Sequence, residues 1–282
     1  MMDDQQKDLY KEKILGVLKY CIAFFDAHDI RWFIACGSAI GAVRHKGIIP
    51  WDDDIDIYMP RADYNRLIAI RSQMEPDGFR FVCLQDAGYP YAFGKVMDTH
   101  TRLVQHRRFP FNVGCYVDIF PLDLTDTGMM SFSKKWKVFR DALLLYRAKI
   151  SRVTFAGLLE DFRTGQFDTC KVIPVKLALL CKSRKKMLAG LLAREATWNQ
   201  AEGDRYVSFT ESGMYMFPRA WFEEYVMVPF EDIEVRIPAQ YDAYLTYMYG
   251  DYMTPPPPEQ RTGDGPHTKL VMDLNANKTE AR

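Results

Sequence analysis

Four aspartates fall within five consecutive positions of the chain, at Asp52, Asp53, Asp54 and Asp56. Carboxylates packed this closely repel one another unless a counter-charge lies among them. In the stretch 54–59 (DIDIYM), acidic and apolar residues alternate, which is typical of a strand with one buried face, so Asp54 and Asp56 point to the same side. Because carboxylate oxygens suit hard cations, we expect a bound Mg²⁺ or Mn²⁺ here. A solvated acidic turn is the other interpretation, and it suffices for Asp53 alone.

Two further features of the sequence can serve the same site. Gly37 and Ser38 follow the apolar run 31–36 and open a short helix over 39–45, so their backbone N–H groups and the hydroxyl are available to a phosphate. Asp118 lies in an apolar strand, where an unpaired carboxylate is heavily penalised. We therefore expect Asp118 to complete a metal-binding triad with the aspartate pair.

The periodicity of the whole chain predicts an α+β fold, with a mixed β-sheet core flanked by helices. We expect three segments: a catalytic core over 1–130, a basic helical insert over 131–200 in which Pro174 separates helices, and a mixed segment over 201–282 that completes the domain. The expected helices outside the insert cover 5–27, 61–75 and 240–249. The expected strands cover 31–36, 54–59, 79–84, 91–98, 101–107, 114–120 and 206–210, with a strand, turn and strand over 225–238.

The charges of the chain cancel overall but are unevenly distributed. There are 37 basic and 37 acidic residues, so nothing attracts the whole protein to nucleic acid, and we expect no nucleic-acid partner. The segment 131–200 holds 15 Lys and Arg against 5 Asp and Glu. Within it, 175–194 has leucines on one side and basic residues elsewhere, a pattern able to lie on an anionic membrane surface. An ordinary packed helix has the same pattern and is more common.

No feature of the sequence predicts export or a membrane-spanning helix. The N-terminus lacks the basic-then-apolar pattern of a signal peptide, and no stretch approaches the ~20 apolar residues of a membrane span. The six cysteines are scattered without a CxxC pair, so we expect small buried side chains in a reducing compartment rather than a zinc site. We therefore expect a cytoplasmic protein, peripheral at the inner face of the membrane if 175–194 docks there.

The stretch 37–57 (GSAIGAVRHKGIIPWDDDIDI) closely resembles the signature of the LicD family, bacterial phosphotransferases that are similar to the fukutin-related phosphotransferases of animals. Supporting resemblances lie in 91–101, 116–123 and 228–261, and the similarity spans about 10–265. The resemblance implies the nucleotidyltransferase fold, in which a glycine turn, an Asp-x-Asp strand and a later aspartate share one site.

The resemblance also implies roles for individual residues. The metal-binding and catalytic positions of the family are matched by Asp52, Asp54, Asp56 and Asp118, of which the last is also a candidate general base. The substrate-binding positions are matched by Gly37, Ser38, Arg44, His45, Lys46 and Lys95. Independently of the resemblance, Arg261 and His267 follow the proline run 255–258, and their position makes them further candidates to close over the substrate.

Members of this family take a phosphorylated alcohol, typically phosphocholine, from a CDP-activated donor and attach it to a sugar hydroxyl of a surface glycan or its lipid-linked precursor. The resemblance thus implies a metal-dependent transferase that releases CMP. A nucleotidyltransferase that releases pyrophosphate from a nucleoside triphosphate needs the same carboxylates and is the alternative. A non-catalytic glycan- or membrane-binding module is a third hypothesis, but such a module has little use for this much clustered negative charge.

Overall fold

The computed structural model describes residues 4–104, 109, 111, 113–164, 168–198, 202–209, 213–261 and 271–273. Its strands are β1 (Phe33–Ile34), β2 (Asp56–Pro60), β3 (Phe79–Val82), β4 (Gly94–Asp98), β5 (Arg102–Val104), β6 (Tyr116–Thr125), β7 (Arg205–Phe209), β8 (Met214–Pro218), β9 (Tyr225–Phe230), β10 (Ile233–Pro238) and β11 (Val271–Asp273). Its α-helices are α1 (Asp4–Ala27), α2 (Cys36–Ile40), α3 (Arg61–Ile70), α4 (Met129–Ile150), α5 (Phe155–Thr164), α6 (Asp168–Ala178), α7 (Arg184–Glu195) and α8 (Tyr241–Tyr249). A π-helix, η1 (Gly41–His45), and the 3-10 helices η2 (Arg71–Asp77), η3 (Arg219–Phe222) and η4 (Pro258–Gln260) complete the elements.

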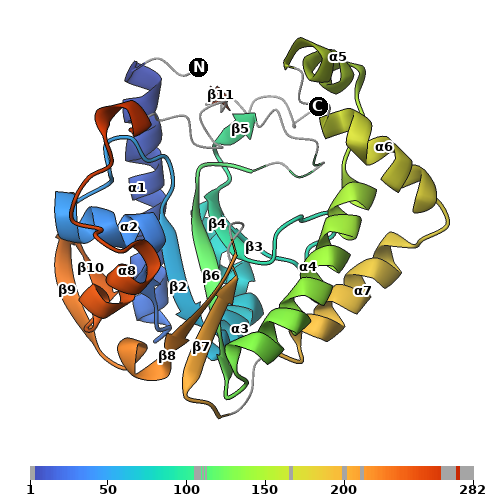
Figure 1. Ribbon diagram of the computed structural model, residues 1–282. Coiled ribbons are helices and arrows are strands. Elements are labelled where there is room, and N and C mark those ends of the chain that lie inside the picture. The colour runs from blue at the N-terminus through green and yellow to red at the C-terminus, as the bar shows by residue number, and fades with distance from the viewer. Residues whose placement is uncertain are drawn as a thin grey trace.

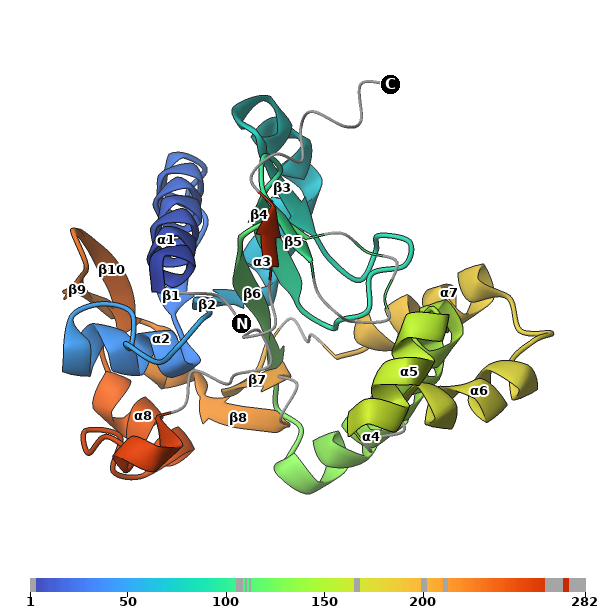
Figure 2. The same cartoon turned by 90° about the horizontal axis from the view of Figure 1, so that it is seen from above.

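The centre of the molecule is a mixed seven-stranded sheet (Figure 1). Five strands follow the order β1-β2-β6-β4-β3, β7 pairs with the end of β6, and β8 pairs with β7. Strands β2 and β6 run parallel, whereas the other neighbours in this sheet are antiparallel. Helices α1, α2 and α8 lie to one side of the strands and α4 to α7 to the other (Figure 2). The predicted α+β class, a mixed sheet flanked by helices, is confirmed.

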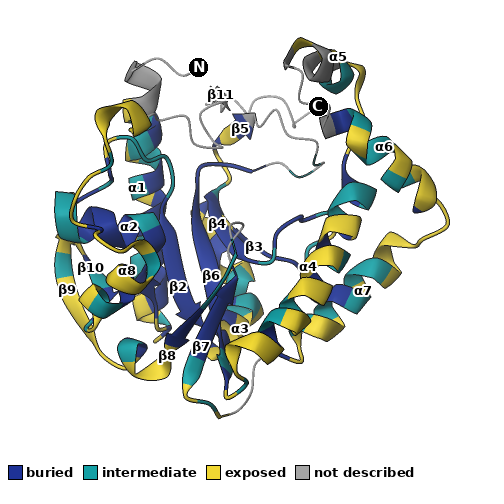
Figure 3. Ribbon diagram, viewed as in Figure 1, coloured by how far each residue is buried: buried dark blue, intermediate teal, exposed yellow. Residues whose placement is uncertain are grey.

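Strand β6 is the axis of this sheet. It pairs with β2 and β4 through its first part and with β7 through its last three residues. Nearly all of its residues are buried, because helices and neighbouring strands cover it from both sides (Figure 3). In the parallel register, Asp56 lies opposite Asp118 and Ile57 opposite Ile119. The register therefore brings two carboxylates together close to the beginnings of the two strands.

The elements around this point differ locally from those expected. Strand β2 begins at Asp56, so Asp54 lies just before the strand rather than within it. The helix expected over 39–45 is split into α2 and the π-helix η1. The helix expected over 61–75 ends as an α-helix at Ile70 and continues as the 3-10 helix η2, which contains Pro76. Pro76, near the end of η2, has no N–H group to donate to a continuing helix.

Four helices, α4 to α7, separate β6 from β7 in the sequence. Helices α4 and α7 pack together with β7 and β8 around a second cluster of buried side chains, whose aromatic members include Phe132, Phe139, Trp198 and Phe209. The aromatic rings are in direct contact, with 4.3 Å between the centroids of Phe139 and Trp198 and 4.6 Å between those of Trp198 and Phe209. This cluster fixes the helices against the lower end of the sheet in Figure 1.

Two expectations about these helices are wrong. Pro174 lies inside α6 and does not separate helices, and the stretch 175–194 is broken at 179–183 instead of forming one helix. The break has a visible cause at α6, because the ammonium of Lys149 donates hydrogen bonds to the carbonyl oxygens of Leu179 (2.6 Å) and Leu180 (3.2 Å). On the other side of the break, the Ser183 side chain caps α7.

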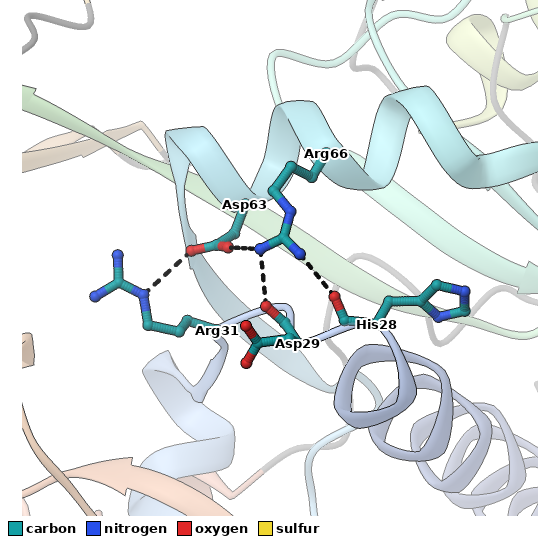
Figure 4. Close-up of polar contacts among 5 residues, drawn as sticks. All are labelled: His28, Asp29, Arg31, Asp63 and Arg66. Carbon is teal, nitrogen blue, oxygen red and sulfur yellow. Dashed lines mark hydrogen bonds and ion pairs between the residues drawn. The ribbon is translucent and has the colours of Figure 1, made fainter.

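Polar contacts tie the end of α1 to α3 (Figure 4). The guanidinium of Arg66 donates hydrogen bonds to the backbone carbonyl oxygens of His28 and Asp29, both at 2.8 Å. The carboxylate of Asp63 accepts from Arg66 at 3.1 Å and from Arg31 at 3.3 Å. These contacts hold α1 close to the sheet although the arginine side chains remain half exposed.

The cysteines are all free thiols and follow the expectation only in part. Four of them are buried, Cys170 is intermediate, and Cys181 is exposed in the break between α6 and α7, so the expectation of burial is wrong for Cys181. In the part of the chain that the structure describes, no helix combines the length and the apolar sequence needed to cross a bilayer.

Candidate functional site

Three carboxylates converge where the parallel strands β2 and β6 begin. Asp56 is the first residue of β2, Asp118 is the third residue of β6, and Asp54 lies two positions before β2. One oxygen atom from each of the three side chains lies within 4.8 Å of the others. Asp56 and Asp118 are buried, whereas Asp54 is partly exposed, so the cluster meets solvent on the side of Asp54.

A second group of carboxylates overlaps the first through Asp54. Asp52, Asp53 and Asp54 also bring one oxygen each within 4.8 Å of the others. The Oδ2 atom of Asp53 is buried and has no hydrogen-bond partner among the described residues. Gly37 is required beside this group, because a Cβ atom at that position would lie 2.8 Å from Oδ2 of Asp52. The glycine of the predicted phosphate-side turn thus makes room for a carboxylate.

Lys95 supplies the positive charge at the buried end of the cluster. It lies on β4 opposite Asp118 in the antiparallel register, and its ammonium forms an ion pair with that carboxylate. Its Nζ atom lies 3.6 Å from the ring centroid of Tyr116 and 5.2 Å from those of Tyr91 and Phe93. Aromatic faces stabilise a desolvated ammonium, so the buried lysine is held in a fixed position against Asp118.

Burial and mutual repulsion raise the pKa values of four of these aspartates. Burial, and then the charge of Asp54, raise the pKa of Asp52 to about 8 and that of Asp53 to about 7. Burial also raises the pKa of Asp54, although the hydrogen bond with Asp52 and the charge of Lys95 oppose the shift. The pKa of Asp56 is raised well above its ordinary value by burial and then by the charges of its neighbours. The cluster therefore contains more negative charge than it can hold without protons or a cation.

These residues fit a divalent cation. All the donors are carboxylate oxygens, the set that hard cations prefer, and among the described residues Lys95 is the one side chain that forms an ion pair with them. The unpartnered Oδ2 atom of Asp53 is one further oxygen available to an ion or to its water. A bound cation would replace the protons that the raised pKa values indicate. Asp54, Asp56 and Asp118 are the residues best placed to hold it.

The turn before α2 positions this cluster through its backbone. Cys36, and not the following glycine, adopts the left-handed conformation, with φ of 49°. Its backbone N–H donates a hydrogen bond of 2.8 Å to the hydroxyl of Tyr244 on α8. The Ser38 hydroxyl accepts a hydrogen bond of 3.0 Å from the backbone N–H of Asp56. Backbone strain of this kind in a non-glycine residue is typical of functional sites. The hydrogen bond between Asp56 and Ser38 joins this turn to the first residue of β2.

Two arginines face the indole of Trp51, the residue that directly precedes the aspartates. The Cζ atom of Arg44 lies 6.0 Å from the ring centroid and that of Arg261 lies 5.1 Å from it. The imidazole of His45 packs edge-on against the same ring, with 5.6 Å between centroids. We call Arg44, His45, Trp51 and Arg261 the arginine cluster. The sequence analysis predicted no contact partner for Arg261. In the structure, its guanidinium lies against the same indole ring as that of Arg44.

The arginine cluster carries positive charge without carboxylate partners. Arg44 and Arg261 donate hydrogen bonds to backbone carbonyl oxygens, at 2.6 and 2.7 Å, and neither forms an ion pair with an acidic residue in the described part of the chain. Burial and the charge of Arg261 lower the pKa of Arg44, and burial and the two guanidinium groups lower the pKa of His45. Like charges held this close favour binding of an anion.

The remaining predicted residues lie less centrally. Lys46 adopts a left-handed conformation, and its carbonyl oxygen accepts a hydrogen bond of 2.8 Å from the N–H of Glu231, but no hydrogen bond or ion pair joins its ammonium to the described carboxylates. His267 lies outside the described residues. No pattern in the sequence pointed to Tyr10 on α1, whose buried hydroxyl has no hydrogen-bond partner among the described residues. Burial and the nearby negative charges, including those of Asp53, raise the pKa of Tyr10.

Comparison with known proteins finds a similarity over the part of the chain that holds this site. The family model described as LicD/FKTN/FKRP, nucleotidyltransferase domain, matches residues 29–158. That range contains both carboxylate groups, Lys95 and the arginine cluster except Arg261.

Three relatives illustrate how far the similarity extends. The Lipopolysaccharide cholinephosphotransferase LicD of Haemophilus influenzae is 28% identical over 258 residues, which cover 88% of this chain and 91% of the relative. The Ribitol 5-phosphate transferase FKRP of Homo sapiens is 41% identical over 39 residues, or 14% of this chain and 8% of the relative. An uncharacterized protein of Rickettsia prowazekii, RP689, is 44% identical over 84 residues, covering 28% of this chain and 32% of the relative.

Proposed function

The chain belongs to the LicD family, and we propose that it transfers a phosphorylated alcohol from a CDP-activated donor to a sugar hydroxyl of a cell-surface glycan or its lipid-linked precursor, with release of CMP. One observation carries this proposal: the carboxylates of Asp54, Asp56 and Asp118 converge within 4.8 Å, and Trp51, just before the acidic run, packs against Arg44 and Arg261, which have no carboxylate partner among the described residues. Metal-binding oxygens next to an anion-binding surface are what the transfer of a phosphoryl group requires.

The residues divide between the metal and the donor. Asp54, Asp56 and Asp118, with Asp52 in the adjoining group, would hold Mg²⁺ or Mn²⁺. When bound, the ion supplies positive charge that neutralises the diphosphate and the phosphorus centre under attack. The guanidinium of Arg44 would bind the diphosphate from the other side, and Arg261 adds a second charge there.

Asp118 is also the candidate that takes the proton from the attacking hydroxyl of the acceptor. Its carboxylate is fixed by Lys95 on one side and lies beside Asp56 on the other, so the general base is held in place before the substrate binds. The backbone turn at Gly37 and Ser38 fixes β2 and leaves room for Asp52. Asp118 and Asp56 are thus supported from separate elements of the fold, β4 and α2.

We propose choline as the most suitable alcohol to test first, because the relative with the longest alignment is named a cholinephosphotransferase, and ribitol second because of the shorter alignment with FKRP. Nucleotidyl transfer is the second candidate, because the matching family model describes a nucleotidyltransferase domain and the same carboxylates serve either reaction. The two reactions differ in what leaves: CMP from a CDP-alcohol, or pyrophosphate from a nucleoside triphosphate.

Phosphorus NMR separates these reactions. We would incubate the protein and Mg²⁺ separately with CDP-choline, CDP-ribitol, CDP-glycerol and CTP, each with and without EDTA. The proposal predicts slow, EDTA-sensitive release of CMP from one CDP-alcohol even without the acceptor. Pyrophosphate from CTP would instead establish nucleotidyl transfer, and cleavage that persists in EDTA would contradict the role of the metal.

We further propose that the protein is cytoplasmic and touches an anionic membrane through α5 and the end of α6, rather than through a continuous helix over 175–194. Phe155 and Leu159, one turn apart on α5, are 76% and 54% exposed, and Leu177 and Leu180 are 60% and 68% exposed. The surrounding segment 131–200 is strongly basic, which favours anionic lipid. Figure 1 places α5 and α6 together at the outer edge of the molecule.

Vesicle sedimentation tests this contact. The protein should bind vesicles that contain phosphatidylglycerol and not those of phosphatidylcholine alone, and Phe155→Ser with Leu180→Ser should weaken binding. Equal sedimentation with both kinds of vesicle, or an unchanged double variant, would contradict the contact.

A further inference from the structure

We propose that a pocket between α4 and the segment leading into β4 is the acceptor subsite, and that it binds an anionic sugar, a hexose that carries a phosphate or a carboxylate. The pocket has a volume of about 160 Å³. The inference rests on the proposed transferase function and adds the chemical class of the acceptor. The side chains that carry the argument are Tyr91, Phe93, Trp136, Arg140, Arg147 and Phe209.

Aromatic rings form the walls of this pocket. The ring of Trp136 on α4 stacks on that of Phe209 on β7, with 4.2 Å between centroids. The ring of Tyr91 stacks on that of Phe93, with 5.2 Å between centroids. Tyr91, Phe93 and Phe209 are buried, so these walls are fixed before a ligand arrives. Flat apolar walls with a few polar groups are typical of sites for small ligands and suit the apolar face of a sugar ring.

Two guanidinium groups determine the charge that the pocket accepts. Arg140 and Arg147 lie two turns apart on α4, and the Cζ atom of Arg147 lies 5.4 Å from the centroid of the Tyr91 ring. Among the described residues that line the pocket, none is acidic, although the exposed carboxylate of Asp141, outside the lining, accepts a hydrogen bond of 3.3 Å from Arg140. Guanidinium groups bind phosphates and carboxylates and repel a quaternary ammonium. The pocket therefore does not suit the choline end of a donor, whereas an anionic sugar matches both its walls and its charge.

The position of the pocket relative to the carboxylates favours the acceptor. The Tyr91 ring that lines it also lies 5.2 Å from the ammonium of Lys95, which is paired with Asp118. In the sheet, β4 adjoins β6 on the side away from β2, whereas Arg44 precedes β2 on η1. Arg44 and His45 of the arginine cluster lie on η1, which continues α2 beside β2, so this cluster lies on the β2 side of the carboxylates and the pocket lies on the β4 side. In-line transfer places the acceptor and the leaving group on opposite sides of phosphorus. When the arginine cluster holds the donor, the pocket on the other side remains available to the acceptor.

Ligand-observed NMR titration of the full-length protein, without donor, tests the subsite. The probes are N-acetylglucosamine, N-acetylglucosamine 6-phosphate and glucuronic acid, which separate a neutral sugar, a phosphate and a carboxylate. We expect at least one anionic sugar to bind more tightly than the neutral one. Arg140→Gln with Arg147→Gln should weaken that binding by roughly tenfold or more, because hydrogen bonds to charged groups are lost. The control Lys134→Gln, at an exposed position of α4 outside the pocket lining, should bind as the wild type does.

Three results would overturn the proposal: equal binding of neutral and anionic sugars, unchanged sugar binding by the double variant, or weaker binding of CDP-choline by the double variant. The last result would assign the pocket to the donor. Thermal unfolding shows whether the double variant is folded, and Arg147→Lys, which retains the charge, should lose less affinity than Arg147→Gln. Cleavage of CDP-alcohols is measured separately, so a protein that binds anionic sugars in this pocket but cleaves no donor would refute the transferase function and not the pocket.

Discussion

Replacing Asp123 with asparagine should destabilise the fold by about 3–5 kcal/mol, because the substitution breaks a buried ion pair. Asp123 on β6 is fully buried and accepts two hydrogen bonds from the guanidinium of Arg61, at 2.7 and 2.8 Å. Glu195 on α7 accepts a third at 3.0 Å. The substitution retains the shape of the side chain but leaves the Arg61 side chain, which is 7% exposed, with one carboxylate in place of two.

A loss of this size is a large share of the ~5–15 kcal/mol that stabilises a typical protein and would lower Tm by roughly 6–15 °C. The same substitution at Asp63 is the matched control. Asp63 contacts Arg31 and Arg66 (Figure 4). Its side chain is 7% exposed, but the two arginines are 59% and 52% exposed, so solvent screens both charges that the substitution leaves behind and Asp63→Asn should cost about 1 kcal/mol.

Urea denaturation followed by circular dichroism measures both free energies of unfolding. Arg61→Gln combined with Asp123→Asn should lose less stability than the sum of the single variants, because the two groups interact directly. Equal losses for Asp123→Asn and Asp63→Asn, or a loss below about 1 kcal/mol at Asp123, would refute the reasoning from burial.

Two more predictions concern the carboxylate cluster. Because the folded-state pKa values of Asp52 (about 8) and Asp53 (about 7) lie above the ordinary value of 3.8, the folded protein binds more protons than the unfolded chain between these pH values, and stability is lost as the pH rises toward 8. The Tm in EDTA should therefore fall between about pH 5 and 8 and level off above pH 8, and Mg²⁺ should raise Tm more at pH 8 than at pH 6; no dependence on pH in either series would count against the cluster. Gly37→Ala places a methyl group 2.8 Å from Oδ2 of Asp52 and should weaken Mg²⁺ binding measured by calorimetry. Gly16→Ala, in open space on α1, should leave Mg²⁺ binding unchanged and stabilise the helix by about 0.5–1 kcal/mol.

The sequence was most informative where local pattern and chemistry agree. The alternation of acidic and apolar residues predicted that Asp54 and Asp56 lie together, and they do, although Asp54 lies before β2. Asp118 was predicted to join them, and the structure places it directly opposite Asp56. The parallel register itself could not be predicted, because it pairs residues 62 positions apart and is decided by packing of the whole sheet.

The contacts made by single side chains could not be predicted. Lys95 was expected to bind substrate, a role that stays a prediction, and no local pattern indicated that its ammonium pairs with Asp118. Trp51 and Arg261 meet because the segment after α8 folds back onto η1 and the turn before β2. The break between α6 and α7 depends on Lys149 from α4, which acts on α6 through tertiary contact and overrides the expectation based on Pro174.

The central claim is that the carboxylates of Asp54, Asp56 and Asp118 perform the transfer. The most direct test measures CMP release from CDP-choline, or from the CDP-alcohol that the protein prefers, by the wild type, Asp56→Asn and Asp118→Asn at saturating Mg²⁺, with thermal unfolding of each variant as the check on folding. We predict that both variants lose turnover by at least about 100-fold, because each lacks a carboxylate that cannot be replaced from solvent. Asp118→Asn also breaks the buried ion pair with Lys95 and should unfold at a lower temperature than Asp56→Asn, so its turnover is measured below that temperature. Substantial turnover by folded Asp56→Asn would contradict the claim.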